Sequence, residues 1–362
     1  MAPRFSILLP TRNRSGLLRL AIATVLAQTE GDFELFVVGD GCTDDSAAVV
    51  AGFGDARIRW FDLPKAPGFG YANRNIALRQ SGGEYIAFVA DDDLVFPDHL
   101  ERLSAALDER GAEWAYNRPL WVTTDGIVVP FASNLLNADE LDRFITVGNH
   151  IPATCVLYRR SCLAAYGYWP EDVLSGGDWR YWIRIIEGGR RANLAYSPVP
   201  TSLHFNALWK TTPDTQLRQV SAGREVATKA VWWPASLKVP MTAGVAEQKV
   251  FSDQIVSHGY IDQLRRDVTR VVERLAWLQL EDTPELLSSV RADLQAATMQ
   301  RDAAKMQLDA ATMQLDAATM QRDAATMQRD AAQARLDAVM RSTSWRLTSP
   351  LRAVSNSIRR VE

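Results

Sequence analysis

The stretch FSILLPTRNRSGLLRLAIATVLAQ, residues 5–28, predicts the fold of the first part of the chain. Residues 5–9 are a short apolar run that ends at Pro10, which is typical of a buried strand. Residues 15–28 follow with apolar side chains at helical spacing, as expected for an amphipathic helix. These apolar positions include Leu17, Leu20, Ala21 and Val25. A buried strand followed closely by such a helix favours an α/β fold.

The same alternation continues to residue 110. The sequence predicts further strands over 35–38, 58–61 and 85–89, and further helices over 44–51, 71–80 and 97–110. Strands and helices that alternate with short connections predict a doubly wound, mostly parallel sheet. In such sheets ligands bind beyond the carboxyl ends of the strands. We therefore look for functional residues directly after each predicted strand.

The rest of the chain is expected to contain different kinds of structure. Residues 111–210 are irregular and predict a mixed β portion with one helix over 178–187. Residues 211–290 form a predicted helical extension, in which 260–280 is strongly amphipathic. We take 1–210 as the first domain, with 1–110 and 111–210 as its two halves.

A seven-residue repeat occupies residues 291–340. Asp recurs from 302 to 337, Met from 299 to 327, and an Ala follows each Met by four residues. Met and Ala then lie at the d and a positions of one seam, which predicts a C-terminal coiled coil and a homo-oligomer. The alternative is a single solvated helix or a low-complexity segment.

The last residues, 341–362, form a basic amphipathic tail. They carry five arginines against one glutamate, together with Trp345 and several aliphatic side chains. Such a tail can lie on an anionic membrane surface. Docking on a partner protein or on the chain itself is the alternative, and the two have equal weight.

The totals exclude several classes of protein. The net charge of −3 predicts no nucleic-acid partner for the chain as a whole. The three cysteines, Cys42, Cys155 and Cys162, form no C-x-x-C pair, so a disulfide framework or zinc site is not expected. We expect neither a signal peptide nor a membrane-spanning helix. A cytoplasmic protein is expected, at the inner face of the plasma membrane if the tail binds lipid.

Polar clusters follow three of the predicted strands. They are residues 10–13, residues 39–44, and the acidic turn Asp91-Asp92-Asp93. Adjacent carboxylates repel one another, and a divalent cation would relieve that repulsion. Mg²⁺ and Mn²⁺ prefer oxygen ligands and are commonly shared between carboxylates and a phosphate of the substrate. An exposed acidic turn that caps the following helix is the alternative.

Four segments in this order resemble the family-2 inverting glycosyltransferases with the GT-A fold. They are FSILLPTRNR, DFELFVVGDGCTDDS, YANRNIALRQSGGEYIAFVADDDLVFPDHL and GGDWRYWIRI. The resemblance covers roughly residues 4–210 and implies a GT-A-like fold. It assigns nucleotide binding to 1–110 and acceptor binding to 111–210. The C-terminal ending STSWRLTSPLRAVSNSIRR is similar to the tails of bacterial polysaccharide glycosyltransferases.

The resemblance implies a role for individual residues. Asp178 would be the catalytic base, and Asp92, Asp93 and His204 would approach an Mn²⁺ or Mg²⁺ ion. The nucleotide would be held by Pro10, Thr11, Arg12, Asp40, Arg74, Asp91 and Asp92. Which of the three adjacent aspartates binds the metal stays open, and His204 is almost as well explained as a surface histidine. His150 lies where members of the family approach the active site.

Aromatic residues near Asp178 suggest an acceptor site. Trp179 and Trp169 could stack on an acceptor sugar, whereas Trp182 is expected in the core. Asp178 itself opens a predicted helix after Gly176-Gly177, so it could also be a simple helix cap. The sequence departs from the family pattern at Gly39 and Ala90, where many members have aspartate.

The sequence thus predicts transfer of a sugar from a nucleotide-sugar donor to a glycan or lipid-linked glycan acceptor, with inversion. A carboxylate that takes the proton of the attacking hydroxyl contributes about 10²–10⁴-fold to the rate. A non-catalytic nucleotide-sugar-binding scaffold, assembled through the coiled coil, is the main alternative. A nucleotidyltransferase is a weaker one, because the glycine-rich, basic loop that such enzymes carry after the first strand is missing.

Overall fold

The computed structural model describes residues 2–206, 218–281 and 283–341. The chain divides into two compact units, Met1–Trp277 and Leu278–Glu362, which we describe separately. The predicted domain boundary at 210/211 lies in 207–217, outside the described residues, and the first unit extends beyond it.

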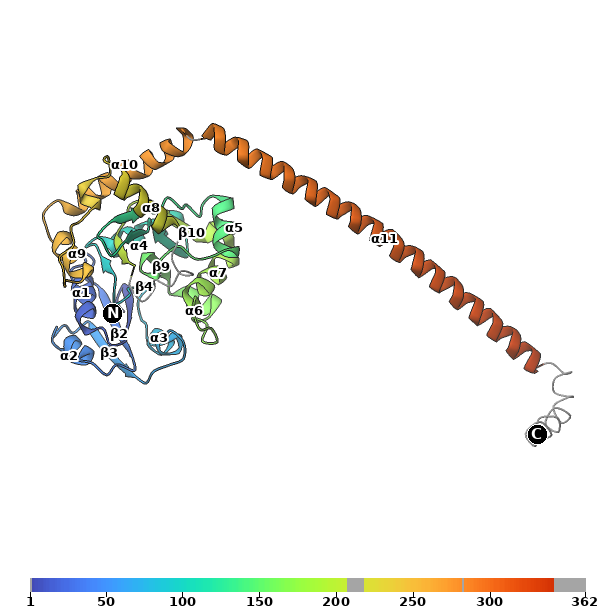
Figure 1. Ribbon diagram of the computed structural model, residues 1–362. Helices are drawn as coiled ribbons and strands as arrows, with labels where there is room; N and C mark the ends of the chain where they lie inside the picture. Colours follow the sequence, from blue (N-terminus) through green and yellow to red (C-terminus); the bar gives the residue numbers. More distant parts are fainter. Residues whose placement is uncertain (1, 207–217, 282, 342–362) are drawn as a thin grey trace, which may run out of the picture. The chain divides into compact units, whose positions relative to one another are not determined.

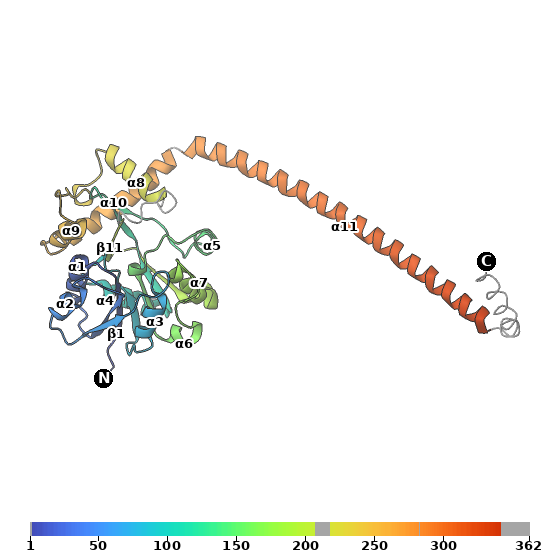
Figure 2. The same ribbon diagram turned by 60° about the horizontal axis from the view of Figure 1, so that its bottom comes forward.

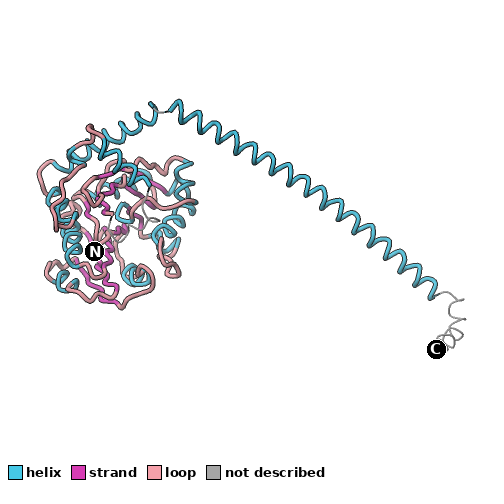
Figure 3. The backbone as a smooth tube through the Cα atoms, viewed as in Figure 1, coloured by secondary structure: helices cyan, strands magenta, loops and turns pink. Residues whose placement is uncertain are grey.

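A seven-stranded sheet forms the centre of the first unit (Figures 1 and 3). Its order is β10-β6-β9-β4-β1-β2-β3. The strands are β1 (Phe5–Thr11), β2 (Phe33–Asp40), β3 (Ile58–Leu63), β4 (Tyr85–Phe88), β6 (Trp114–Asn117), β9 (Val156–Arg159) and β10 (Leu194–Ser197). Every neighbouring pair is parallel except the two that involve β9. The predicted α/β fold with a mostly parallel sheet is confirmed.

Alternating apolar side chains in the strands bury both faces of this sheet. Ile7 and Leu9 of β1 pack on one face with helices α1 (Ser15–Leu26) and α4 (His99–Arg110). Leu8 points to the other face, where it joins a core with helices α3 (Tyr71–Leu78) and α7 (Gly177–Gly189). Helix α2 (Ser46–Ala51) packs beside α1, and α5 (Ala138–Thr146) and α6 (Ser161–Tyr166) also belong to this unit. Successive residues of β1 therefore point to opposite faces of the sheet, and helices cover both faces, as in the predicted doubly wound arrangement.

A second, four-stranded sheet joins the acidic turn to the helical extension. Its order is β5-β11-β7-β8, with β5 (Leu94–Val95), β7 (Leu120–Val122), β8 (Val128–Pro130) and β11 (Ser202–Phe205). Helices α8 (Arg218–Lys229), α9 (Glu247–Ile255) and α10 (Tyr260–Glu281) share one core with it (Figure 2). The amphipathic helix predicted over 260–280 is present as α10. The extension is thus packed onto the same unit as the main sheet.

The second unit contains one long helix, α11 (Thr283–Arg341). The predicted helical repeat is confirmed as a helix, whereas its pairing into a coiled coil stays a prediction. The tail at 341–362 lies outside the described residues beyond Arg341.

Two observations bear on the expected compartment. No helix in the described part of the chain has the length and apolarity needed to cross a membrane. All three cysteines are free thiols, with Cys155 and Cys162 buried and Cys42 half-buried.

A buried polar cluster lies beneath the second sheet. His99 has no exposed surface, and its Nδ1 lies 2.8 Å from the hydroxyl of Thr201, which accepts a 2.7 Å hydrogen bond from Asn117. Burial lowers the pKa of His99 to about 4, because a charged ring would be poorly solvated there.

We predict that His99 makes stability fall with acidification. An unfolded chain protonates this histidine near pH 6.5 and the folded chain only near pH 4, so the unfolded state binds more protons between these values. The free energy of unfolding should decrease by roughly 3 kcal/mol between pH 6.5 and 4 through this residue. Urea titrations should show a flatter pH dependence for His99→Gln; an identical slope in both proteins would contradict the assignment.

Candidate active site

The polar clusters predicted after three strands meet at one edge of the main sheet. Thr11 is paired with Gly39 across β1 and β2, and Leu8 is paired with Phe88 across β1 and β4. The carboxyl ends of β1, β2 and β4 are therefore adjacent. Asp40 ends β2, and the acidic turn begins three residues after Phe88, the last residue of β4.

Asp40 is buried and held by three partners. Its carboxylate accepts hydrogen bonds from the Asn73 side chain at 2.7 Å and the Ala66 backbone N–H at 2.8 Å. Lys65 forms an ion pair with it at 2.9 Å. These contacts fix the orientation of Asp40 at the pocket wall and neutralise its charge.

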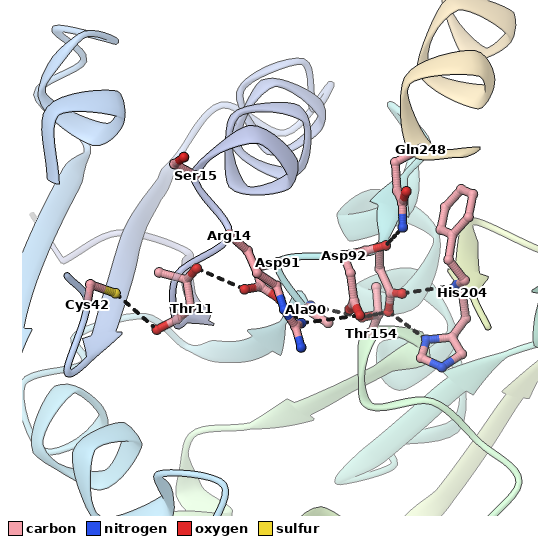
Figure 4. A network of polar contacts seen from close by, with 12 residues as sticks. Thr11, Arg14, Ser15, Cys42, Ala90, Asp91, Asp92, Thr154, His204 and Gln248 are labelled. Carbon is pink, nitrogen blue, oxygen red and sulfur yellow. Dashed lines mark hydrogen bonds and ion pairs between the residues drawn. The ribbon is translucent and has the colours of Figure 1, made fainter. Parts of the chain in front are cut away.

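Asp91 and Asp92 face the segment between β1 and helix α1 from the acidic turn (Figure 4). Asp91 accepts hydrogen bonds from Thr11 Oγ1 at 2.8 Å and from Arg14 at 2.9 Å, and Arg14 also lies 3.4 Å from Asp92. Burial and the neighbouring Asp92 raise the pKa of Asp91 to about 6, although Arg14 and Thr11 act against this. The ion pair with Arg14 therefore does not fully offset the burial of Asp91 and its repulsion by Asp92.

Asp93 has a different environment from its two neighbours. It is 1% exposed, and its carboxylate is surrounded by donors from other elements. It accepts hydrogen bonds from the Thr154 hydroxyl, from His204 Nδ1 at 2.8 Å and from the Phe205 backbone N–H at 3.3 Å. Thr154 in turn accepts a bond from the backbone N–H of Ala90 at 3.1 Å. Asp93 thus ties the acidic turn to β11.

The helical extension also contacts the acidic turn. Gln248 of α9 is buried and donates a hydrogen bond to the backbone carbonyl of Asp92 at 3.2 Å (Figure 4). Because a buried carbonyl needs a partner, this bond stabilises the conformation of the turn from the side of α9.

Two pockets open at this edge of the sheet and share a wall. The first, which we call the acidic pocket, has a volume of about 360 Å³; it is lined by Thr11, Arg12, Arg14, Asp40, Asp91 and Asp92 together with Pro10 and Lys65. The second, the Asp178 pocket, has a volume of about 570 Å³; it is lined by Asp178, Asp93, His204, Trp121 and His150 among others. Their common wall consists of Phe69, Arg74, Phe88 and Ala90.

Arg74 of α3 is the cation in this common wall. Its guanidinium lies over three rings, 4.9 Å from the centroid of Tyr71 and 5.2 Å from those of Phe88 and Trp169. Burial lowers the pKa of Arg74, while Tyr71, Asp178, Asp40 and Asp91 counteract that effect. Arg74 therefore interacts electrostatically with the carboxylates of both pockets.

Asp178 lies in the first turn of α7 and is positioned by a close packing contact. The Tyr71 hydroxyl accepts a 3.0 Å hydrogen bond from the backbone N–H of Gly177. A Cβ at residue 177 would lie 2.7 Å from the Tyr71 ring, so only glycine fits. Burial raises the pKa of Asp178, against the lowering influence of its backbone hydrogen bonds, Arg74 and His204. A carboxylate in this environment is more basic than an exposed one.

The structure places the predicted aromatic residues outside both pockets. Trp169 is 2% exposed and packs on Arg74 and Phe88, and the indole N–H of Trp179 is bonded to the Phe144 carbonyl at 2.8 Å. Trp121 of β7 instead reaches the Asp178 pocket, with its ring 4.3 Å from that of His204. His150 lines the same pocket, and its Nε2 is buried without a hydrogen-bond partner.

The two departures from the family pattern have structural surroundings of their own. A Cβ at Gly39 would lie 2.5 Å from the Trp60 ring, so this indole occupies the space of a side chain. Ala90 forms part of the wall between the pockets and presents no charge there.

The chain offers only part of a metal-ligand set. Among the described residues no group of three or more His, Cys, Asp or Glu side chains has the arrangement of a metal site. Mg²⁺ and Mn²⁺ can nevertheless be bound by one or two carboxylates completed by substrate phosphates and water. Asp91 and Asp92 fit that requirement, because both line the acidic pocket, where burial and the neighbouring Asp92 raise the pKa of Asp91. Asp93 and His204 are already bonded to each other.

Several site residues carry no clear signal in the sequence. Six residues contact or line the site without belonging to a predicted cluster: Arg14, Lys65, Asn73, Trp121, Thr154 and Gln248. Of these, Arg14 directly follows the first polar cluster and could have been included with it. Thr154 and Gln248 reach the site only through tertiary packing.

Comparison with known proteins places the first unit in a family. A family model described as "Glycosyl transferase family 2" matches residues 6–167. Among curated relatives, an uncharacterised glycosyltransferase of Rickettsia conorii is 28% identical over 189 residues, which are 50% of this chain and 30% of that protein. The Escherichia coli UDP-Glc:alpha-D-GlcNAc-diphosphoundecaprenol beta-1,3-glucosyltransferase WfgD is 30% identical over 128 residues. That match covers 35% of this chain and 50% of the E. coli protein.

The matches therefore concern a part of each protein, and the chain spans between about a third and a half of these relatives. Among solved structures, residues 1–349 of S. aureus TarS in complex with UDP-GlcNAc align with a TM-score of 0.48 and 20% identity. The alignment covers 70% of each chain.

We predict that neighbouring aspartates of the acidic turn affect stability in opposite directions. Asp91→Asn removes a charge that burial and Asp92 oppose, so at pH 7 the free energy of unfolding should stay constant or rise by about 1–3 kcal/mol. The gain should shrink progressively as the pH falls from 6 towards 4, because Asp91 of the folded wild type becomes protonated over this range. Asp93→Asn weakens hydrogen bonds to a buried carboxylate and should cost about 2–3 kcal/mol.

Urea unfolding at pH 7 and pH 5 measures both variants against the wild type. A large loss of stability for Asp91→Asn, or none for Asp93→Asn, would contradict this distinction between the two carboxylates.

Proposed function

This chain belongs to glycosyl transferase family 2 through the domain at residues 6–167, and we propose that it transfers a sugar from a nucleotide-sugar donor to a glycan or lipid-linked glycan. One observation carries the proposal. The acidic pocket and the Asp178 pocket share a wall, so a donor bound in the first has its sugar next to the second. The E. coli relative bears a name that specifies UDP-Glc and a diphosphoundecaprenol-linked sugar, which supports this class of substrates.

In the proposed reaction the acidic pocket binds the nucleotide. Pro10, Thr11 and Arg12 border it, and Asp40 accepts a hydrogen bond from the base. The Asn73 and Lys65 contacts hold Asp40 in place for this role. Arg14 and Arg74 line the pocket and supply positive charge for the diphosphate, which becomes more negative as the sugar leaves.

Asp91 and Asp92 would hold the proposed Mn²⁺ or Mg²⁺ together with the donor phosphates. When bound, such an ion stabilises the charge of the departing diphosphate as a Lewis acid. We assign Asp93 to a supporting role, because its carboxylate bonds to Thr154 and His204. This role orients His204 toward the Asp178 pocket, where its other ring nitrogen remains for the diphosphate or the ion.

Asp178 is the proposed general base. It would accept the proton of the acceptor hydroxyl as that oxygen attacks the anomeric carbon from the face opposite the diphosphate, which inverts the configuration. A raised pKa suits this role, since a more basic carboxylate takes the proton more readily. Because Arg74 lies between the two pockets, it stabilises the ionised form of Asp178 before the proton arrives.

The acceptor sugar would lie in the Asp178 pocket. Trp121 offers a ring for stacking, and the unpartnered Nε2 of His150 offers a nitrogen for a hydrogen bond. These two residues replace Trp169 and Trp179 in our assignment, because neither of the latter lines a pocket.

The C-terminal part is proposed to place the enzyme. Pairing of α11 would bring copies of the chain together, and the basic tail would hold them at the inner face of the plasma membrane, where lipid-linked glycans are available.

We predict that Asp178→Asn abolishes transfer while donor binding persists. Transfer should fall by about 10²–10⁴-fold, because the hydroxyl loses its proton acceptor. The measurement is sugar transfer from a panel of nucleotide sugars with Mn²⁺, followed by calorimetric titration of each protein with the donor that is used. A matched control is Asp172→Asn, which changes an exposed carboxylate six residues earlier and should retain full activity.

Two outcomes would contradict the assignment. Full activity of Asp178→Asn would exclude it as the base. A wild type that binds a nucleotide sugar but neither transfers nor hydrolyses it under any condition would favour the non-catalytic scaffold.

We further predict that residues 341–362 direct the chain to anionic lipid. In flotation with vesicles of phosphatidylglycerol and phosphatidylcholine, the full chain should rise with the vesicles and a chain that ends at residue 340 should not. Neutral phosphatidylcholine vesicles serve as the control, and equal recovery of both chains in the soluble fraction would contradict the proposal.

A further inference from the structure

Helix α11 presents an apolar seam to the solvent along most of its length. Within the described residues, the seam consists of five methionines at heptad position d, each 74% exposed, and of exposed alanines at position a. The methionines are Met299, Met306, Met313, Met320 and Met327. The alanines are Ala303, Ala310, Ala317, Ala324 and Ala331. A methyl-rich seam on a helix of 59 residues needs a partner helix to leave water.

The residues that flank the seam follow an equally regular pattern. Position g is aspartate in six consecutive heptads, at 302, 309, 316, 323, 330 and 337. Position e is glutamine in five heptads, at 300, 307, 314, 321 and 328, and Arg335 in the next. One flank is therefore acidic and the other carries hydrogen-bond donors.

This pattern distinguishes the two possible orientations of a pair. In a parallel pair, position g of one helix faces position e of the next heptad of its partner. The first four aspartates then each meet a glutamine amide, and Asp330 meets Arg335. In an antiparallel pair g faces g and e faces e, so aspartate would face aspartate at every heptad. Like charges at such close range destabilise the pair.

We propose that α11 binds α11 of a second copy of this chain as a parallel, in-register coiled coil. The inference extends the self-association proposed above and does not depend on the catalytic assignment. Alanine at every a position lets the two helices approach closely, and the flexible methionines fill the remaining space. Register follows from overlap, because a shift by one heptad leaves a methionine layer unpaired at each end.

Neighbouring arginines on the same helix relieve only some of the aspartates. Arg301, Arg322 and Arg329 contact the aspartate that follows each of them, at distances of 2.8–3.3 Å. Asp309 and Asp316 follow Leu308 and Leu315 instead, so they have no such neighbour. These two lie at the middle of the repeat, where an antiparallel pair would bring them face to face.

A charge substitution separates the two orientations by the sign of its effect. In the double variant Gln314→Lys/Gln321→Lys, a parallel pair gains ion pairs with Asp309 and Asp316 on both flanks. The dissociation constant from sedimentation equilibrium should fall by about tenfold. In an antiparallel pair the new lysines would face each other and the constant would rise. The matched control Leu308→Lys/Leu315→Lys adds the same charge at the outer f position and should leave the constant close to that of the wild type.

Disulfide trapping tests the register in the full chain with Cys42→Ser. Met299→Cys should cross-link with itself, and a mixture of Met299→Cys and Ala331→Cys chains should give only the two homodimers. The two positions are about 48 Å apart along a helix, so a mixed disulfide forms only in an antiparallel pair. A mixed disulfide, a rise in the dissociation constant, or the mass of one chain (40.3 kDa) at micromolar concentration would overturn the proposal. UDP binding by the same samples reports separately on the proposed catalytic function.

Discussion

The site depends on one buried cation held among aromatic rings. Arg74 is enclosed by Tyr71, Phe88 and Trp169, and it lies within the electrostatic reach of Asp40, Asp91 and Asp178. These carboxylates come from three separate segments of the chain, which would repel one another without a cation between them. Arg74 thereby allows the acidic pocket and the Asp178 pocket, our proposed nucleotide site and proton acceptor, to share one wall. The glycine at 177 belongs to the same arrangement, since it lets Tyr71 pack against the start of α7.

The acidic turn divides its work between adjacent residues. Asp93 faces inward and binds Thr154, His204 and the backbone of β11, so it contributes to the fold. Asp91 and Asp92 face the acidic pocket, where burial and their proximity raise the pKa of Asp91. A bound cation would reduce the repulsion between these two carboxylates. Gln248 holds the backbone of the turn from α9, which makes the helical extension a structural part of the site. Removing the helical extension would therefore also remove a hydrogen bond that stabilises the acidic turn.

Much of this architecture follows from local sequence. The apolar run in β1 and the helical spacing in α1 predicted the first strand and helix within two residues of their ends. The alternation of such strands and helices predicted the doubly wound sheet. The clusters at Thr11, Asp40 and the acidic turn were predicted together because strand ends share an edge. The acceptor side stays a prediction. Trp121, Trp169 and Trp179 are alike in the sequence, and only tertiary packing decides that Trp121 lines a pocket. Gln248 and Thr154 could not be predicted, because their contacts join segments that no periodicity relates.

The proposed reaction requires the sugar donor and the Asp178 carboxylate to meet at the common wall that contains Arg74. The most direct measurement is an experimental structure of the chain with a nucleotide sugar that it accepts, in the presence of Mn²⁺. We expect the nucleotide base to lie beside Asp40 and the diphosphate to lie between Arg14, Arg74 and Asp92. The anomeric carbon should face Asp178 within the Asp178 pocket. A nucleotide sugar bound elsewhere, or bound with its anomeric carbon turned away from Asp178, would contradict it.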